Sequence, residues 1–132
     1  MKNTEIFIVN HHLAQGTFLK YHMNLNGFKN VRLYQNYDEC LYTIQKDHTP
    51  QFMVMDCTDS ISADLKFIQL IHKYNSAIRI IIFSENDNPE NVRQFFNAGI
   101  TDYIVKLEKS TNRINELISN LQFIIKKENL MR

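Results

Sequence analysis

Reactive side chains stand where apolar runs of this sequence end. Asp56 directly follows the run FMVM, Ser84 ends the run IRIIIFS, and Lys106 ends the run YIVK. A carboxylate, a hydroxyl and an ammonium group make a chemically coherent set if the fold brings them together, with the carboxylate as the candidate reactive group. The alternative is that Asp56 only caps the segment that follows its run.

The apolar run at residues 52–55 is the element that must position Asp56. Every residue in it is apolar, which favours a central strand of a parallel sheet, buried on both faces. The other predicted strands are residues 5–9, 31–34, 78–84 and 103–106, with 31–34 at an edge. Open α/β sheets bind ligands at the carboxyl ends of their strands. We therefore expect these side chains to meet at one edge: Asn10, His11, Asp56, Ser84 and Lys106.

Helical patterns fill the segments between the predicted strands. The first helix has its apolar positions at Ala14, Phe18, Tyr21, His22 and Leu25, and Gly27 ends it. The predicted starts of the later helices are Asn36, Ser62, Asn88 with Pro89, and Ser110 or Thr111. The apolar stripe of the last helix comprises Ile114, Leu117, Ile118, Leu121, Ile124 and Ile125. Strands that alternate with helices predict an α/β domain of three layers, α/β/α, with a five-stranded parallel sheet.

The composition limits the classes of function. The chain has 132 residues, 44% of them hydrophobic, which is the size of one domain with a proper core. A net charge of +1 and the lack of a basic stripe argue against direct contact with nucleic acid. No apolar window approaches the ~18 residues of a membrane span, and the N-terminal apolar run is too short for a signal peptide. Cys40 and Cys57 lack a CxxC spacing, which predicts reduced thiols of a cytoplasmic protein.

Three segments carry a resemblance to a known family. They are VMD at residues 54–56, FS at 83–84 and NAGITDYIVK at 97–106. In this order, and over essentially the whole chain, the sequence resembles the receiver domains of bacterial two-component response regulators. The resemblance implies a flavodoxin-like, doubly wound (βα)5 fold. It also implies that Asp56 accepts a phosphoryl group from a histidine kinase, with Ser84, Tyr103 and Lys106 as the switch residues.

The sequence departs from the family at the acidic pair that follows its first strand. Asn10 and His11 stand at the matching places and form a degenerate acidic pocket. Mg²⁺ prefers carboxylate oxygens, so we expect no cofactor or only weak Mg²⁺ binding, with Asp56 as a weak candidate ligand. Asp59 and Glu85 are expected to be solvated loop charges rather than replacement ligands.

Two further departures lie in loops beside the same edge. Leu107 replaces the family's proline after the lysine, which predicts a trans peptide bond and a differently shaped loop. Ser60 and Asp64 replace a proline and a glycine downstream of Asp56, which predicts a reshaped loop there as well.

The pair His11-His12 suggests a transition-metal site as an alternative. Imidazole binds zinc well, but adjacent residues at a strand end point apart, and no Cys or third His completes a coordination shell. Polar filling of the pocket is the preferred interpretation.

These observations leave two main hypotheses for function. The first is an atypical receiver, a regulatory protein-interaction module with impaired or absent Mg²⁺-dependent phosphorylation. The second is a functional receiver that is phosphorylated on Asp56 and controls a transcriptional output domain. A flavodoxin-like cofactor binder or a small hydrolase uses the same architecture. Only one glycine follows the first strand, and no nucleophile-base pair is evident, so we expect no enzyme.

The expected partners are proteins: a sensor histidine kinase, an output domain or another regulator. Membrane contact is not expected. A homodimer is possible through the face of the fourth helix, fifth strand and fifth helix, which carries Arg93, Phe96, Asp102, Lys106, Arg113 and Glu116. Residues 1–126 are the predicted domain, and residues 127–132 are the predicted tail or the start of a linker.

Overall fold

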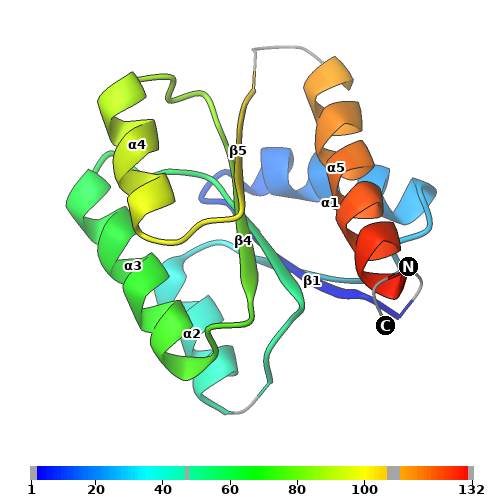
Figure 1. Ribbon diagram of the computed structural model, residues 1–132, viewed down its shortest axis with the longest axis horizontal. Coiled ribbons are helices and arrows are strands. Elements are labelled where there is room, and N and C mark those ends of the chain that lie inside the picture. Colours follow the sequence, from blue (N-terminus) through cyan, green and yellow to red (C-terminus); the bar gives the residue numbers. More distant parts are fainter. Residues whose placement is uncertain (1–2, 47, 107–110, 131–132) are drawn as a thin grey trace.

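A computed structural model describes residues 3–46, 48–106 and 111–130. In the described part, five strands alternate with five helices along the chain (Figure 1). The strands are β1 (Glu5–Val9), β2 (Asn30–Tyr34), β3 (Phe52–Met55), β4 (Arg79–Ser84) and β5 (Asp102–Val105). The helices are α1 (Leu13–Leu25), α2 (Tyr37–Gln45), α3 (Ile61–Tyr74), α4 (Pro89–Asn97) and α5 (Thr111–Leu130).

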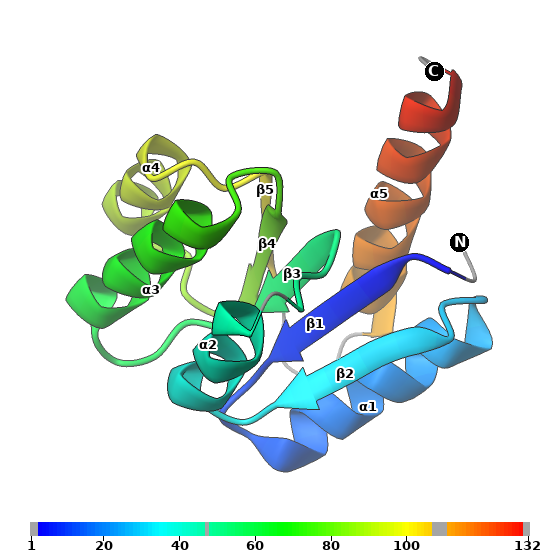
Figure 2. The same ribbon diagram turned by 90° about the horizontal axis from the view of Figure 1, so that it is seen from below.

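The strands form one parallel sheet in the order β2-β1-β3-β4-β5. Helices α1 and α5 cover one face of this sheet, and α2, α3 and α4 cover the other (Figures 1 and 2). The predicted α/β/α architecture, with a five-stranded parallel sheet, is therefore confirmed, and β2 lies at an edge as expected.

Alternation along the strands divides the core into two halves. Ile6 and Ile8 of β1 pack between the sheet and helices α1 and α5, whereas Phe7 and Val9 pack between the sheet and helices α2, α3 and α4. The central strand β3 divides in the same way, and all four of its residues are at most 1% exposed. Burial on both faces explains why this strand is apolar at every position, and it places Asp56 at the carboxyl edge of the sheet.

The sequence predicts several helix ends correctly. The Oδ1 atom of Asn36 accepts a hydrogen bond from the Glu39 N–H at 2.8 Å, and Asn88 caps α4 in front of Pro89. Gly27 and Gly99 follow α1 and α4 with φ angles of 92° and 101°. Residues other than glycine rarely adopt such φ angles. Glycine is therefore well suited to both positions, where a helix ends.

The predicted start of α3 is wrong by two residues. Ser60, not Ser62, is the N-cap, because its Oγ accepts a hydrogen bond from the Ala63 N–H at 3.1 Å. Asp64 consequently lies in the first turn of α3, where a carboxylate interacts well with the helix dipole. Asp64, which stands where the family has a glycine, therefore lies inside a helix rather than in a reshaped loop.

The predicted buried face of α1 is also wrong. The buried residues are Gly16, Leu19 and Met23, whereas the predicted positions Ala14, Phe18, Tyr21 and Leu25 are exposed and His22 is half-buried. Gly16 explains the orientation, because a Cβ atom there would lie 2.6 Å from Cδ1 of Leu33 in β2. The helix turns its glycine towards the sheet and approaches β2 closely.

The stripe of α5 is confirmed. Ile114, Leu117, Ile118 and Leu121 are buried, and Ile124 and Ile125 pack against them. The helix continues to Leu130, past residue 126. The predictions for Leu107 and Ser110 fall outside the described residues. None of the described helices is long and apolar enough to cross a membrane.

Candidate functional site

Asp56 continues the β3 ladder by one residue and turns its carboxylate towards β5. Its N–H donates to the carbonyl of Val9 at 3.0 Å, which holds the residue at the sheet edge. The carboxylate Oδ1 accepts a hydrogen bond from the Cys57 N–H at 2.8 Å, and the side chain is 11% exposed. Asp56 is thus an anchored and largely buried carboxylate, not merely a loop charge.

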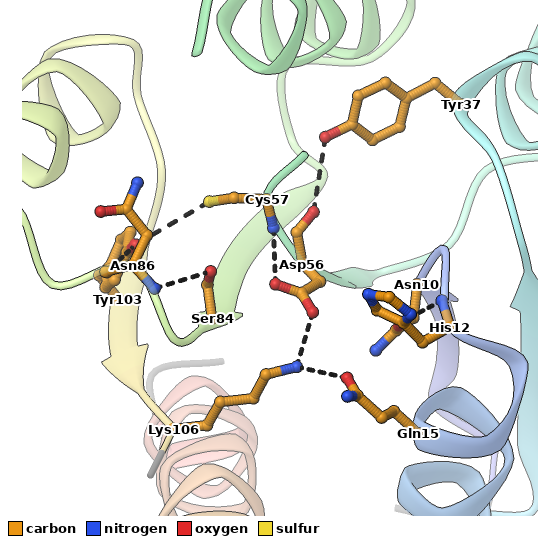
Figure 3. A network of polar contacts seen from close by, with 10 residues as sticks. All are labelled: Asn10, His12, Gln15, Tyr37, Asp56, Cys57, Ser84, Asn86, Tyr103 and Lys106. Carbon is orange, nitrogen blue, oxygen red and sulfur yellow. Dashed lines mark hydrogen bonds and ion pairs between the residues drawn. The ribbon is translucent and has the colours of Figure 1, made fainter. Parts of the chain in front are cut away.

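Lys106 follows β5 and supplies the opposite charge. Its backbone N–H donates to the carbonyl of Ser84 at 2.8 Å, and its Nζ lies 2.6 Å from Oδ2 of Asp56 (Figure 3). Nζ also donates to Oε1 of Gln15 in α1 at 3.0 Å. The ion pair is largely buried, with the lysine side chain 13% exposed, so each charge depends on the other for compensation.

Ser84 and Tyr103 lie on the β4 side of the site. Ser84 is 3% exposed, and its Oγ accepts a hydrogen bond from the Asn86 N–H at 3.2 Å. The hydroxyl of Tyr103 donates to the carbonyl of Asn86, so both side chains hold the same loop after β4 (Figure 3). Burial raises the pKa of the Tyr103 hydroxyl, which keeps it protonated as a donor.

A cavity of about 220 Å³ opens at this edge. Its walls come from the ends of β3, β4 and β5 and from the start of α1. The lining residues are His12, Gln15, Asp56, Cys57, Thr58, Asp59, Ser84, Glu85, Asn86 and Lys106. The structure therefore brings together three of the five predicted side chains, namely Asp56, Ser84 and Lys106.

Asn10 and His11 take other positions. Asn10 is 5% exposed, and its Oδ1 accepts a hydrogen bond from the His12 N–H at 2.8 Å. The His11 ring is outside the cavity lining and meets the Tyr37 ring edge-on, with 5.2 Å between the ring centroids. His12 lines the cavity and His11 does not.

Asp64 forms a second polar cluster behind Asp56, which the sequence did not reveal. This carboxylate is fully buried and accepts hydrogen bonds from the Tyr37 hydroxyl at 2.6 Å and from Thr58 Oγ1 at 2.7 Å. The Thr58 N–H also donates to it, at 3.1 Å. Desolvation by burial, followed by the bond to Asp64, raises the pKa of Tyr37. The cluster ties the loop after Asp56 to α2 and α3.

The two cysteines are both free thiols. Cys57 lines the cavity, with its Sγ 3.9 Å from the Tyr103 hydroxyl. Burial raises the pKa of the Cys57 thiol to about 11, so the thiolate that would be nucleophilic is scarce at neutral pH.

The donor set at this edge differs from the carboxylate cluster that Mg²⁺ prefers. Asp56 already has an ammonium group at Oδ2, and Asn10 uses its Oδ1 for the backbone. Within residues 3–46, 48–106 and 111–130, no group of three or more His, Cys, Asp or Glu residues is placed to hold a metal ion.

Solved structures with the same fold are available for comparison. A CheY-like response regulator receiver domain from Methanospirillum hungatei JF-1 has a TM-score of 0.81 at 18% identity, with 98% of each chain covered. The receiver domain of Francisella response regulator 1452 has a TM-score of 0.80 at 22% identity, with 96% of this chain and 99% of that chain covered. An atypical orphan response regulator has a TM-score of 0.71 at 19% identity, covering 88% and 90%.

No curated protein matches the chain. The family profile of the response regulator receiver domain matches residues 6–119, which include Asp56, Ser84, Tyr103 and Lys106. The match spans most of the chain, and the fold and the sheet-edge site agree with it. This chain therefore belongs to the family of response regulator receiver domains.

Proposed function

We propose that this receiver domain is an atypical one, a regulatory module that acts through protein contacts and has impaired or absent Mg²⁺-dependent phosphorylation. Receiver domains serve in signal transduction within response regulators, and they bind Mg²⁺ at the phosphorylation site. The observation that carries the proposal is the environment of the Asp56 carboxylate. An ammonium group lies 2.6 Å from it, Asn10 and His11 stand in place of the acidic pair, and the other carboxylates of the cavity, Asp59 and Glu85, are exposed loop residues.

The charges around Asp56 determine how well a divalent cation can bind there. In phosphoryl transfer a divalent cation neutralises the charge that develops between the donor and acceptor oxygens. With Asn10 and His11 at the positions of the acidic pair, a cation loses its carboxylate ligands and is opposed by the Lys106 ammonium beside Asp56. Asp59 and Glu85 line the cavity but are exposed, so a cation bound there would stay largely hydrated. We therefore expect Mg²⁺ to bind weakly or not at all.

A functional receiver phosphorylated on Asp56 by a histidine kinase is the second candidate. The arrangement that favours it is the meeting of Asp56, Ser84 and Lys106 around one cavity. A hydroxyl and an ammonium group can both bind the oxygens of a phosphoryl group on Asp56, which would add roughly −1.5 to −2 of charge. Tyr103 contacts the Asn86 loop, so a shift of Ser84 can be transmitted to the surface of α4.

Protein partners remain the expected ligands: a kinase, an output domain or another regulator. On the face of α4, β5 and α5 the charged side chains bond locally. Arg93 pairs with Glu90, Arg113 pairs with Glu116, and Asp102 accepts a hydrogen bond from Asn120 at 2.8 Å. Lys106 turns into the site, which leaves Phe96, 44% exposed, as the apolar contact for a homodimer through this face.

Intact mass spectrometry tests the proposed function. The protein is incubated with Mg²⁺ and acetyl phosphate, and a labile adduct of about 80 Da is sought, with Asp56→Ala as the matched control. Little or no adduct on the unmodified protein is the expected result. Rapid and complete formation of an adduct that Asp56→Ala lacks would establish the second candidate instead.

A further inference from the structure

Helix α1 is apolar on two opposite faces. One face packs on the sheet through Gly16, Leu19 and Met23. The other points outward, and in Figure 2 no other described element lies against the outer side of this helix. The outward residues, which we name the α1 seam, are Ala14, Phe18, Tyr21 and Leu25. A surface helix usually has a polar outer face, so the domain's own core does not account for the seam.

The seam has the spacing of a helix-helix contact. Its residues follow one another at intervals of four, three and four positions, which is the alternation of the a and d positions in a heptad repeat. Phe18 is 47% exposed, Tyr21 57% and Leu25 63%. Large aromatic and aliphatic side chains at these positions are suited to insert between the side chains of a second helix.

We infer that the α1 seam pairs with the α1 seam of a second copy of this chain, in an antiparallel arrangement about a two-fold axis. In this arrangement Phe18 faces Tyr21 of the second copy, and small Ala14 faces large Leu25 of the second copy. Each contact occurs twice by symmetry, so one helix supplies both halves of the interface. The aromatic rings pair, and the volumes of the other pair complement each other.

The polar flanks of the seam favour a second copy over a different protein. The residues beside the seam are Gln15, Thr17, His22 and Asn24. Heptad seams that select a different partner use opposite charges at these flanking positions. Here the flanks carry no Asp, Glu, Lys or Arg, so nothing in them repels a second copy. The net charge of +1 adds little repulsion between whole chains.

The size of the seam sets the expected strength of pairing. Phe18, Tyr21 and Leu25 are each about half exposed and together present roughly 300 Å² of apolar surface per copy. Two such surfaces form an interface smaller than the standard size, as in weak and transient association. We therefore expect a weak dimer with a dissociation constant on the order of 10–100 µM.

Pairing at the seam would also reach the candidate site. Gln15 flanks the seam, and its Oε1 accepts a hydrogen bond from Lys106 Nζ at 3.0 Å. A second copy on α1 would lie beside this contact, at the mouth of the cavity that His12 and Gln15 line. The oligomeric state and the accessibility of Asp56 are therefore expected to be coupled.

Sedimentation velocity over about 1–300 µM protein tests the inference. The unmodified chain should show concentration-dependent dimerisation, and Phe18→Lys or Tyr21→Glu alone should raise the dissociation constant at least ~10-fold. An equimolar mixture of the two variants should regain association, because the antiparallel register sets the introduced lysine against the introduced glutamate. Tyr42→Glu, at an exposed aromatic on α2, is the matched control and should leave the dissociation constant unchanged, and Phe96→Glu probes the competing face of α4, β5 and α5.

Circular dichroism establishes that each variant is folded before its association is compared. A chain that is monomeric at every concentration overturns the inference. The seam would then be a contact surface for a different protein. Loss of the dimer in Phe96→Glu, but not in Phe18→Lys, also overturns it and assigns the contact to the face of α4, β5 and α5. A mixture that fails to associate rules out the antiparallel register.

Discussion

At the scale of single residues, the sequence predicts some residues of the candidate site but not others. Asp56, Ser84 and Lys106 were predictable because each ends an apolar strand, and strand ends converge in a parallel sheet. Asp64 was not predictable, because its role depends on donors from α2 and from the loop after β3. His12 was missed because the choice between adjacent histidines depends on how the chain turns into α1.

The Asp64 cluster predicts a loss of stability on truncation. Asp64→Ala removes the acceptor of the Tyr37 hydroxyl and of two Thr58 donors, all beside a fully buried position. Because buried donors without partners are costly, we expect the free energy of unfolding to fall by about 2–4 kcal/mol in urea titrations. Asp59→Ala, at an exposed position of the same loop, should change it by less than about 0.5 kcal/mol. Equal effects would show that the cluster does not stabilise the loop.

The raised pKa of Cys57 predicts a pH dependence at alkaline pH. Its thiol titrates near 11 in the folded chain, against an ordinary value of 9.0, so the unfolded chain loses this proton first. The contribution is fully present below about pH 9 and is lost as the pH rises towards about 11. Urea midpoints between pH 8 and 10 should therefore fall more steeply for the unmodified chain than for Cys57→Ser. Parallel pH profiles, or fast alkylation of Cys57 at pH 8, would contradict this assignment.

At the scale of elements, the caps and the central strands follow from local patterns, whereas the orientation of α1 does not. Asn36, Asn88, Gly27 and Gly99 act where the sequence predicts, because capping depends on only a few neighbouring residues. Helix α1 has apolar residues on two faces, so periodicity alone does not decide which face is buried. The close approach of Gly16 to Leu33 decides it, and this contact depends on the tertiary structure.

The cap of α4 provides a prediction at this scale. The Oδ1 atom of Asn88 accepts hydrogen bonds from the N–H groups of Glu90 and Asn91, at 3.0 and 3.1 Å. Asn88→Ala leaves both donors to water, so thermal or urea unfolding should show a loss of about 1 kcal/mol. Asn88→Asp keeps the acceptor and should remain close to the unmodified stability at neutral pH. A loss in Asn88→Asp as large as that in Asn88→Ala would exclude the cap as the cause.

At the scale of the whole molecule, the alternation of strands and helices was enough to predict the three-layer architecture. The receiver family match and the shared fold place the molecule among signalling modules. Within that fold the sheet edge brings together Asp56, Ser84 and Lys106, while the Asn10 side chain bonds to the His12 N–H and the His11 ring packs against Tyr37. We propose that the residues at positions 10 and 11 are the cause of weak Mg²⁺-dependent chemistry.

The most direct test is the initial rate of Asp56 phosphorylation by acetyl phosphate with and without Mg²⁺, in the unmodified chain and in Asn10→Asp/His11→Asp. The substitutions place carboxylates at the two positions of the family's acidic pair and leave Asp56, Ser84 and Lys106 unchanged, and carboxylates bind Mg²⁺. We expect a slow rate that Mg²⁺ barely changes in the unmodified chain, and a Mg²⁺-dependent rate at least ~10-fold faster in the double variant. A fast, Mg²⁺-dependent rate in the unmodified chain, matched by the double variant, would contradict this expectation.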